Sequence, residues 1–275
     1  MNEKKIVILT GSELRHRYFR QFLSCSKYIK VLKSYCEGEE KSLKNLILKS
    51  SQEKDLRIQH LNQRECYERE FFLEFCQKNI DNSNPVYIDK GAINHQKYVD
   101  EIQYLDPDLI ISYGCSIINS KLLEHFKDRF INVHLGLSPY YRGSGTNYFP
   151  FVNNEPVFCG VTFMHIDRGI DTGEIIHQIR AELRYGDNIH LVGNRLIESM
   201  TSETEKLIFN FDTLKNKSVN FPPMPRYFYK NKDFTEKSLE ILYDNFSSGM
   251  IENYILNKDD LCEKYPIVQQ HWEYV

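Results

Sequence analysis

The sequence lacks the signatures of several classes of protein. Its seven cysteines form no Cys-x-x-Cys pair and no cluster with histidine at the spacing of a zinc site. No apolar run approaches the roughly 18 residues of a membrane span, and MNEKKIVILT has too short an apolar stretch for a secretory signal. We therefore expect a cytoplasmic protein with reduced cysteines, no bound metal and no membrane partner.

The chain also lacks a marked excess of either charge. Its formal net charge is -3 over 275 residues, which provides no general attraction to nucleic acid or to anionic lipid. A hydrophobic content of 41% and a charged content of 27% are typical of a globular protein. The length suits one large domain, or one domain with a small appendage.

Short apolar runs alternate with helical patterns, which predicts an α/β fold. KKIVILTG ends in Gly11, and apolar residues at helical spacing follow from Leu14, with Ser12 as the expected N-cap and Arg15 facing outward. A strand, a glycine turn and a helix at the start are typical of a doubly wound sheet. Further strands are predicted at residues 28–37, 84–90, 106–114, 129–134, 158–166 and 174–183, and helices at 93–105, 116–126, 145–152 and 189–211.

Two segments are expected to lie outside this pattern. Residues 39–82 are rich in charge, contain neither proline nor glycine, and repeat apolar residues at helical spacing. We expect a helical insertion there, one long helix or a pair, whose charges form a solvated face. The proline-rich FPPMPRYFYK then punctuates the chain, so we expect a main domain over residues 1–212 and a mostly helical extension over 213–275.

The strand predicted at residues 129–134 carries two polar side chains. Asn132 and His134 are two residues apart, so they point to the same face near the carboxyl end of the strand. Ligands bind at that end in open parallel sheets. A buried pair satisfied by backbone groups is the alternative reading.

A tight turn, DRGIDTG, supplies carboxylates that could reach this pair. Asp167 and Asp171 flank a glycine between two predicted strands, and the alternative interpretation is that both only form the turn. A carboxylate beside histidine orients the imidazole, and an amide and an imidazole together can donate hydrogen bonds to a developing oxyanion. Because there is no Gly-x-Ser-x-Gly motif, the residues favour direct acyl transfer or hydrolysis, without a covalent enzyme intermediate and without a metal.

Three motifs follow one another here: Asn-x-His from Asn132, Ser-Pro-x-Tyr-Arg-Gly from Ser138, and Asp-x-Gly-x-Asp-x-Gly from Asp167. In this order, after DPDLIISYG, they resemble the folate-dependent formyltransferases, which include glycinamide ribonucleotide, methionyl-tRNA and nucleotide-sugar enzymes. The family's usual loop reads roughly His-Pro-Ser-Leu-Leu-Pro-x-Tyr-Arg-Gly, so Leu135 and Gly136 replace the proline and the serine. The resemblance covers roughly residues 5 to 212.

The resemblance implies a modified Rossmann fold, 10-formyltetrahydrofolate as formyl donor, and catalysis by Asn132, His134 and Asp171. An amine would attack the formyl carbon, Asn132 and His134 would stabilise the oxyanion, and Asp171 would orient His134. Whether His134 acts mainly as a base or as a donor stays open. A loop and a turn would hold the pteridine largely through backbone groups, and the cofactor candidates in them are Gly114, Ser116, Ile118, Asp167 and Gly169.

Other polar residues have two interpretations each. Gly11 and Ser12 would present helix N-terminal amides to an anionic part of the substrate, or Ser12 would only cap its helix. Arg142 would contact a phosphate or anchor its loop. Thr146 would face the acceptor or cap a short helix. The remaining histidines, His16 among them, show no pairing pattern and are expected in the core or on the surface.

The resemblance leaves the acceptor open. Members that act on tRNA carry a further β-barrel domain, whereas residues 213–275 are predicted to be helical with mixed charge. We expect a small amine, most simply an amino sugar on a nucleotide, destined for surface polysaccharide such as lipopolysaccharide, and no nucleic acid partner. Alternatives are methionyl-tRNA, another biosynthetic amine, or a non-catalytic folate- or nucleotide-binding protein. Aromatic residues of 221–246 would pack on the parent domain or on a second copy, and similarity to sugar enzymes favours a homodimer.

Overall fold

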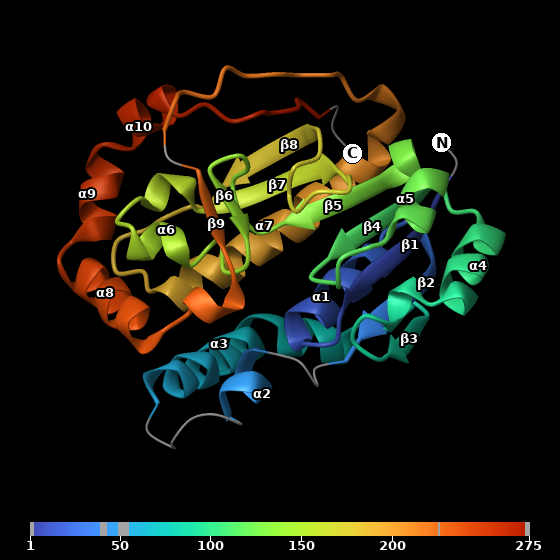
Figure 1. The fold of residues 1–275 in the computed structure, drawn as a ribbon, viewed down its shortest axis with the longest axis horizontal. Coiled ribbons are helices and arrows are strands. Elements are labelled where there is room, and N and C mark those ends of the chain that lie inside the picture. The colour runs from blue at the N-terminus through green and yellow to red at the C-terminus, as the bar shows by residue number, and fades with distance from the viewer. Residues whose placement is uncertain (1–2, 39–42, 49–54, 225, 273–275) are drawn as a thin grey trace.

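The computed structural model describes residues 3–38, 43–48, 55–224 and 226–272. Within these residues seven strands form one sheet in the order β3-β2-β1-β4-β5-β7-β8 (Figure 1). The first four pairings are parallel, while β7 runs antiparallel to both β5 and β8. The predicted Rossmann-like α/β fold is therefore confirmed. The strands are β1 (Lys4–Gly11), β2 (Ile29–Glu37), β3 (Pro85–Ile88), β4 (Leu109–Tyr113), β5 (Phe130–His134), β7 (Gly160–His165) and β8 (Ile175–Arg180).

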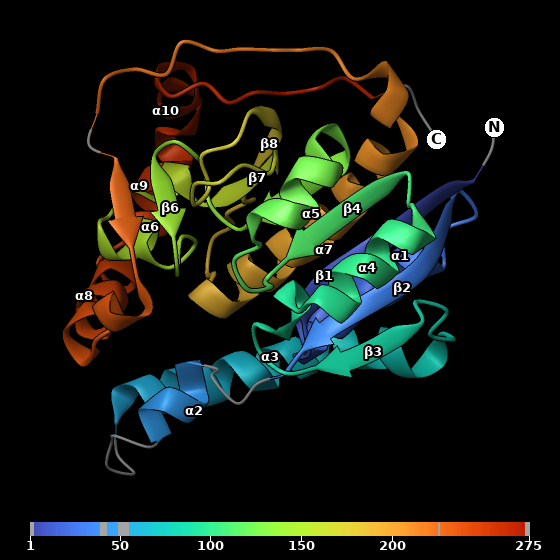
Figure 2. The same ribbon diagram turned by 45° about the vertical axis from the view of Figure 1, so that its right-hand side comes forward.

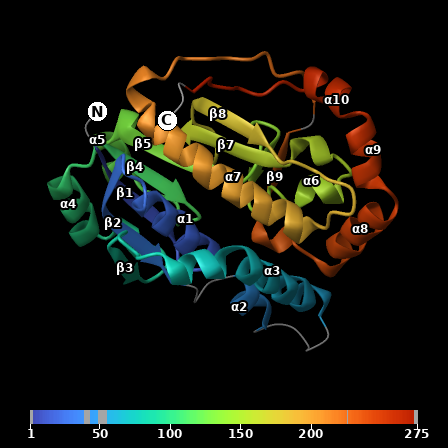
Figure 3. The same ribbon diagram turned by 180° about the vertical axis from the view of Figure 1, so that it is seen from behind.

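The alternation of side chains along β1 explains why helices cover both faces of the sheet. Ile6 and Ile8 belong to one core cluster, Val7 and Leu9 to another, and all four are at most 1% exposed. On the first face lie α1 (Leu14–Ser24), α3 (Leu56–Lys78) and α7 (Ile189–Phe209), which Figure 3 shows from behind. On the second face lie α4 (Gln96–Leu105) and α5 (Ser120–His125), seen in Figure 2.

The segment 39–82 forms a pair of helices, α2 (Leu43–Leu48) and α3, while residues 39–42 and 49–54 lie outside the described residues. α3 contacts α1 and α7. Its charges do not all form a solvated face, because Glu68 is 3% exposed and pairs with Arg15 at 2.7 Å. The predicted outward position of Arg15 is wrong for the same reason: opposite charges can be buried together when each satisfies the other.

The last part of the chain contains a strand that the sequence did not predict. β9 (Tyr227–Tyr229) pairs in parallel with β6 (Tyr141–Gly143), a short strand in the loop after His134 (Figure 1). Three helices follow: α8 (Glu236–Ser247), α9 (Met250–Leu256) and α10 (Lys258–Lys264). α8 contacts α3, where the Leu56 amide donates to Glu236 Oε1 at 2.8 Å and His60 Nδ1 lies 2.9 Å from the Tyr243 hydroxyl.

The aromatic residues of 221–246 pack mainly on the parent domain. Phe234 and Leu242 are buried, and Phe221, Tyr227, Tyr229 and Phe246 are partly buried against the main core. The homodimer expected through this region stays a prediction.

Some local boundaries differ from those predicted. α1 begins at Leu14 with Glu13 as its N-cap residue, so the predicted capping role of Ser12 is wrong. The helix predicted at 116–126 begins at Ser120, and the one predicted at 145–152 is α6 (Phe149–Val152). Short 3-10 helices occupy Ala92–Asn94, Lys127–Arg129, Pro156–Phe158, Phe211–Thr213 and Asn231–Asp233.

Within the described residues, none of the helices combines the length and the apolar content that a membrane span requires.

Gly143 is the position where β6 depends on glycine. Its φ is +92°, and a Cβ there would lie 2.1 Å from the carbonyl oxygen of Tyr229. Gly143→Ala should therefore lower the free energy of unfolding by more than the ~1–2 kcal/mol of left-handed backbone strain alone. Urea denaturation measures the loss.

Gly186→Ala is the matched control, because Gly186 has a φ of +79° but nothing within 4 Å of a Cβ. Equal losses in the two variants would contradict close approach of β9 as the reason for glycine at position 143.

Candidate active site

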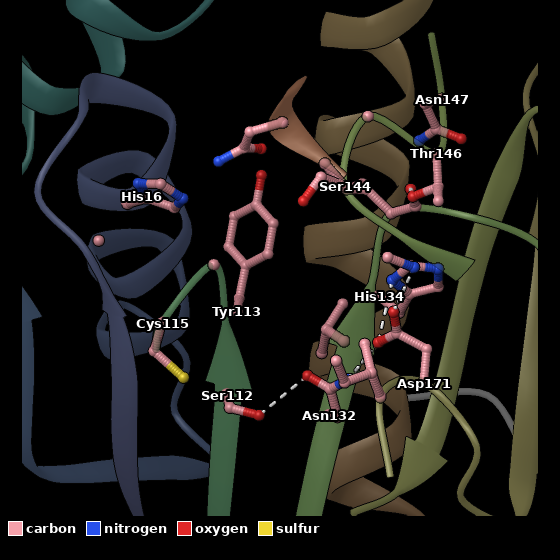
Figure 4. A pocket seen from close by; sticks show the side chains of 18 of the residues that line it. His16, Ser112, Tyr113, Cys115, Asn132, His134, Ser144, Thr146, Asn147 and Asp171 are labelled. Atoms are coloured by element: carbon pink, nitrogen blue, oxygen red, sulfur yellow. Dashed lines mark hydrogen bonds and ion pairs between the residues drawn. The ribbon is translucent and has the colours of Figure 1, made fainter. Parts of the chain in front are cut away.

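Asn132 and His134 lie at the end of β5 and face the same space, as predicted from their spacing (Figure 4). The Ser112 hydroxyl of β4 donates to Asn132 Oδ1 at 3.1 Å, so the amide is held with its nitrogen toward Asp171. That nitrogen, Nδ2, donates to Asp171 Oδ1 at 3.2 Å. An amide nitrogen carries two hydrogens, and this bond uses one of them.

Asp171 joins the two β5 residues to the loop that follows them. Its Oδ1 lies 3.2 Å from His134 Nδ1, and its Oδ2 accepts from the Gly143 amide at 2.9 Å. The side chains of His134 and Asp171 are 6% and 10% exposed. Asp171 also has a φ of +52°, a left-handed conformation that aspartate tolerates better than most residues. The predicted set Asn132, His134 and Asp171 is therefore brought together.

The imidazole of His134 has an oxygen acceptor at each nitrogen. Nδ1 faces Asp171, and Nε2 lies 3.2 Å from the carbonyl oxygen of Tyr141. Both nitrogens can donate only in the doubly protonated ring. Space around the ring is tight, because a Cβ at Gly136 would lie 2.5 Å from Nε2. Glycine at position 136 thus leaves room for the imidazole.

These residues open into a cavity of about 820 Å³, large enough for two small ligands side by side. The eleven residues predicted to be catalytic or to bind the cofactor or the substrate all line it. They are Gly11, Ser12, Gly114, Ser116, Ile118, Asn132, His134, Thr146, Asp167, Gly169 and Asp171. Arg142 is not among the lining residues. The candidate residues therefore lie around one cavity, although lining it does not assign each residue a role.

The loop Gly114–Ile118 is held in place by Glu37, at the end of β2. Glu37 is 2% exposed and accepts from the Ser116 amide at 2.6 Å, the Gly91 amide at 3.0 Å and Lys90 Nζ at 3.0 Å. No sequence pattern indicated this residue, because its partners come from two segments that are distant from it in the chain. Glu37 fixes the position of the predicted pteridine loop.

Two of the predicted ligand residues use their side chains within the protein. The Asp167 carboxylate accepts from the Gly169 amide at 2.9 Å and the Thr172 hydroxyl at 2.8 Å, so it shapes its own turn. The Thr146 hydroxyl donates to the carbonyl oxygen of Leu135. Ligand contacts at Asp167 and Gly169 would therefore come mainly from the backbone, as expected.

His16 belongs to the cavity, although the sequence indicated no role for it. Its ring lies between Gly11 and Gly114, where a Cβ would approach ring atoms to 2.6 and 2.4 Å, and Nδ1 is 3.0 Å from Glu13 Oε2. Burial and the neighbouring Arg15 lower the pKa of His16. Helical spacing alone could not distinguish this buried face of α1 from a solvated one.

The extension also contributes to the cavity. Phe228, Tyr229, Lys230 and Phe234 line it, and Phe228 is 44% exposed. Tyr229 stacks on Phe149 with ring centroids 3.6 Å apart. Since β9 forms on β6, the loop after His134 and the extension together make this side of the cavity. Among the described residues, no group of three or more histidine, cysteine, aspartate or glutamate side chains is arranged to hold a metal ion.

Comparison with known proteins assigns the family. The model of the formyl transferase family matches residues 46–204, which is more than half of the chain. The chain therefore belongs to the formyl transferase family.

Curated proteins with similar sequences include methionyl-tRNA formyltransferases. A methionyl-tRNA formyltransferase of Finegoldia magna is 27% identical over 166 residues, covering 56% of this chain and 52% of that protein. The chain thus matches about half the length of this curated relative.

Solved structures support the fold. A sugar N-formyltransferase from Shewanella has a TM-score of 0.53 and 16% identity, covering 84% of this chain and 78% of that one. A phosphoribosylglycinamide formyltransferase from Anaplasma phagocytophilum has a TM-score of 0.55 and 13% identity, covering 83% and 99%. At these identities the likeness concerns the fold alone, and it does not select an acceptor.

Glu37 gives a test of how the site is positioned. Glu37→Gln replaces one acceptor oxygen by an NH₂ group, which donates and cannot accept. The backbone amide that faces this group, of Gly91 or of Ser116, then has no hydrogen-bond acceptor. We expect the free energy of unfolding to fall by ~1–3 kcal/mol, and hydrogen exchange at these two amides to accelerate.

Glu101→Gln is the matched control, because the Glu101 carboxylate is 37% exposed and bonded to side chains, Lys33 and Tyr35. Unchanged exchange at Gly91 and Ser116 in the Glu37 variant would show that Glu37 does not hold the loop.

Proposed function

We propose that the protein transfers a formyl group from 10-formyltetrahydrofolate to the amine of a small acceptor, most simply a nucleotide-linked amino sugar, in the cytoplasm. The observation that carries this proposal is the Asp171 carboxylate, which holds Asn132 and His134 together at the edge of a cavity of about 820 Å³. Membership of the formyl transferase family supports the reaction class.

In this reaction the uncharged amine attacks the formyl carbon. Negative charge develops on the formyl oxygen, where the second hydrogen of Asn132 Nδ2 would donate a hydrogen bond. A protonated His134 would donate a second one by exchanging the Tyr141 carbonyl for the formyl oxygen as the acceptor at Nε2. Asp171 would balance the charge on His134. When the intermediate collapses, the bond from the formyl carbon to N10 of the folate breaks, N10 takes up a proton, and the amine nitrogen loses one. The products are the formamide and tetrahydrofolate.

The donor would lie against Gly114, Ser116 and Ile118 on one side and Asp167 and Gly169 on the other. The Asp167 carboxylate already accepts hydrogen bonds from its own turn, and the glycines have no side chain. Backbone groups would therefore bind the donor at these positions. When bound, the folate supplies the activated formyl group. The protein would orient it and stabilise the charge that develops during transfer.

A nucleotide-linked acceptor is supported by the extension. Phe228 presents a partly exposed ring at the cavity, and Lys230 Nζ lies 5.7 Å from its centroid. An aromatic ring is a surface on which a base can stack, and a lysine is a suitable partner for a phosphate. Methionyl-tRNA is the second candidate acceptor, favoured by the names of curated relatives. A homodimer through 221–246 remains part of the proposal.

The reaction can be followed by the absorbance of the folate product. Wild-type protein is incubated with 10-formyltetrahydrofolate and a panel of nucleotide-linked amino sugars, charged initiator tRNA and glycinamide ribonucleotide. We expect turnover with an amino sugar, and we expect His134→Ala to lower kcat by ~100-fold or more, because it removes the oxyanion donor.

His125→Ala serves as the control, since His125 is exposed and lies at the end of α5. Unchanged transfer by the His134 variant would overturn the catalytic assignment, and turnover with tRNA alone would overturn the proposed acceptor.

A further inference from the structure

We propose that one side of the cavity, here called the polar wall, binds the uncharged, hydroxyl-bearing sugar ring of the acceptor. The polar wall consists of Tyr113, His190 and Asn194, together with the ion-paired Arg15, Arg64, Glu13 and Glu68. This inference rests on the proposed function, and it names the residues that would recognise the acceptor.

Three buried side chains of the polar wall have polar atoms without a hydrogen-bond partner. These atoms are the Tyr113 hydroxyl, His190 Nε2 and Asn194 Nδ2. The three residues are 3%, 7% and 3% exposed, and all line the cavity. Buried polar groups are normally satisfied, so three unpaired groups along one cavity wall point to a ligand that supplies the partners.

The three groups reach the same cavity from two elements, β4 and α7, and α1 and α3 add the charged residues of the polar wall. Tyr113 ends β4, and His190 and Asn194 are one turn apart on α7. Burial raises the pKa of Tyr113, and among its charged neighbours Arg15 lowers that pKa while Glu68 raises it. Tyr67 of α3 stacks on His190 with ring centroids 5.3 Å apart. Figure 4 shows the Tyr113 side chain projecting from β4 into the space between α1 and the β5 side.

The charges of the polar wall cancel. Arg15 pairs with Glu68 at 2.7 Å and with Glu13 at 2.5 Å, and Arg64 lies 3.5 and 3.9 Å from the same two carboxylates. Burial lowers the pKa of His190 to about 4, so its ring is neutral at neutral pH. Two arginines and two glutamates therefore leave no net charge.

This balance selects the chemistry of the ligand. A phosphate would lie beside two carboxylates with no surplus cation to offset it, and it offers only acceptors. A sugar hydroxyl both donates and accepts, as do a tyrosine hydroxyl and a neutral histidine in its two tautomers. An uncharged ring with several hydroxyls matches the unpaired groups of the polar wall better than a phosphate does.

Tyr113→Phe tests the proposal with little risk to folding, because it removes a hydroxyl that has no partner in the protein. Binding of a UDP-linked amino hexose and of UDP alone is measured by titration calorimetry. We expect the Kd for the sugar nucleotide to rise about fivefold or more, with the Kd for UDP unchanged. Thermal melting should show that stability is maintained.

Tyr140→Phe is the matched control. Tyr140 is fully buried, its hydroxyl also lacks a partner, and it does not line the cavity. Its loss should change neither Kd. Asn194→Ala, with Ser199→Ala on the exposed side of α7 as its control, should also weaken binding of the sugar nucleotide without affecting that of UDP.

The outcomes separate this inference from the proposed function. If Tyr113→Phe raised the Kd values for the sugar nucleotide and for UDP equally, or raised neither, the assignment of the polar wall to the sugar would be overturned. Absence of binding of the sugar nucleotide to wild-type protein would overturn it as well. Selective weakening without any formyl transfer by wild-type protein would support the polar wall and contradict the proposed reaction.

Discussion

A single carboxylate, that of Asp171, connects the parts of this site. It accepts from Asn132, faces His134, and accepts from the Gly143 amide. The first two contacts align polar side chains at the end of a core strand. The third holds Gly143 at the end of β6, the strand with which β9 pairs. Without this carboxylate, the Asn132 amide and the His134 ring would lose their common partner, and β6 would lose its link to the turn. The arrangement of Asn132 and His134 and the position of β6 beside the cavity therefore depend on the same residue.

The two segments that lie outside the α/β pattern meet each other at the cavity. α3 brings Arg64 and Glu68 to the polar wall, and the extension brings Phe228 and Lys230 to the same cavity. They are joined where His60 of α3 contacts Tyr243 of α8. Acceptor recognition would thus use α3 and the extension together with β4 and α7 of the core, while the chemistry would reside in the strand ends and the turn. This division is consistent with one fold serving several acceptors.

The sequence was sufficient to predict the sheet and the grouping of Asn132, His134 and Asp171, because both depend on local pattern. Alternation along β5 placed Asn132 and His134 on one face, and motif order added Asp171. It could not predict the β6–β9 pairing, since that depends on contacts between segments far apart in the chain and on the positive φ of Gly143. Nor could it predict the ion pair of Arg15 with the buried Glu68. Helical periodicity alone predicts that charged residues face solvent.

The most direct test of this account is a crystal structure of the protein with tetrahydrofolate and a nucleotide-linked amino sugar. The account predicts that the folate lies against the loop Gly114–Ile118 and the amine lies between Asn132 and His134. The sugar ring would contact Tyr113 and Asn194. A folate outside this cavity, or an acceptor amine beyond the reach of Asn132 and His134, would contradict it.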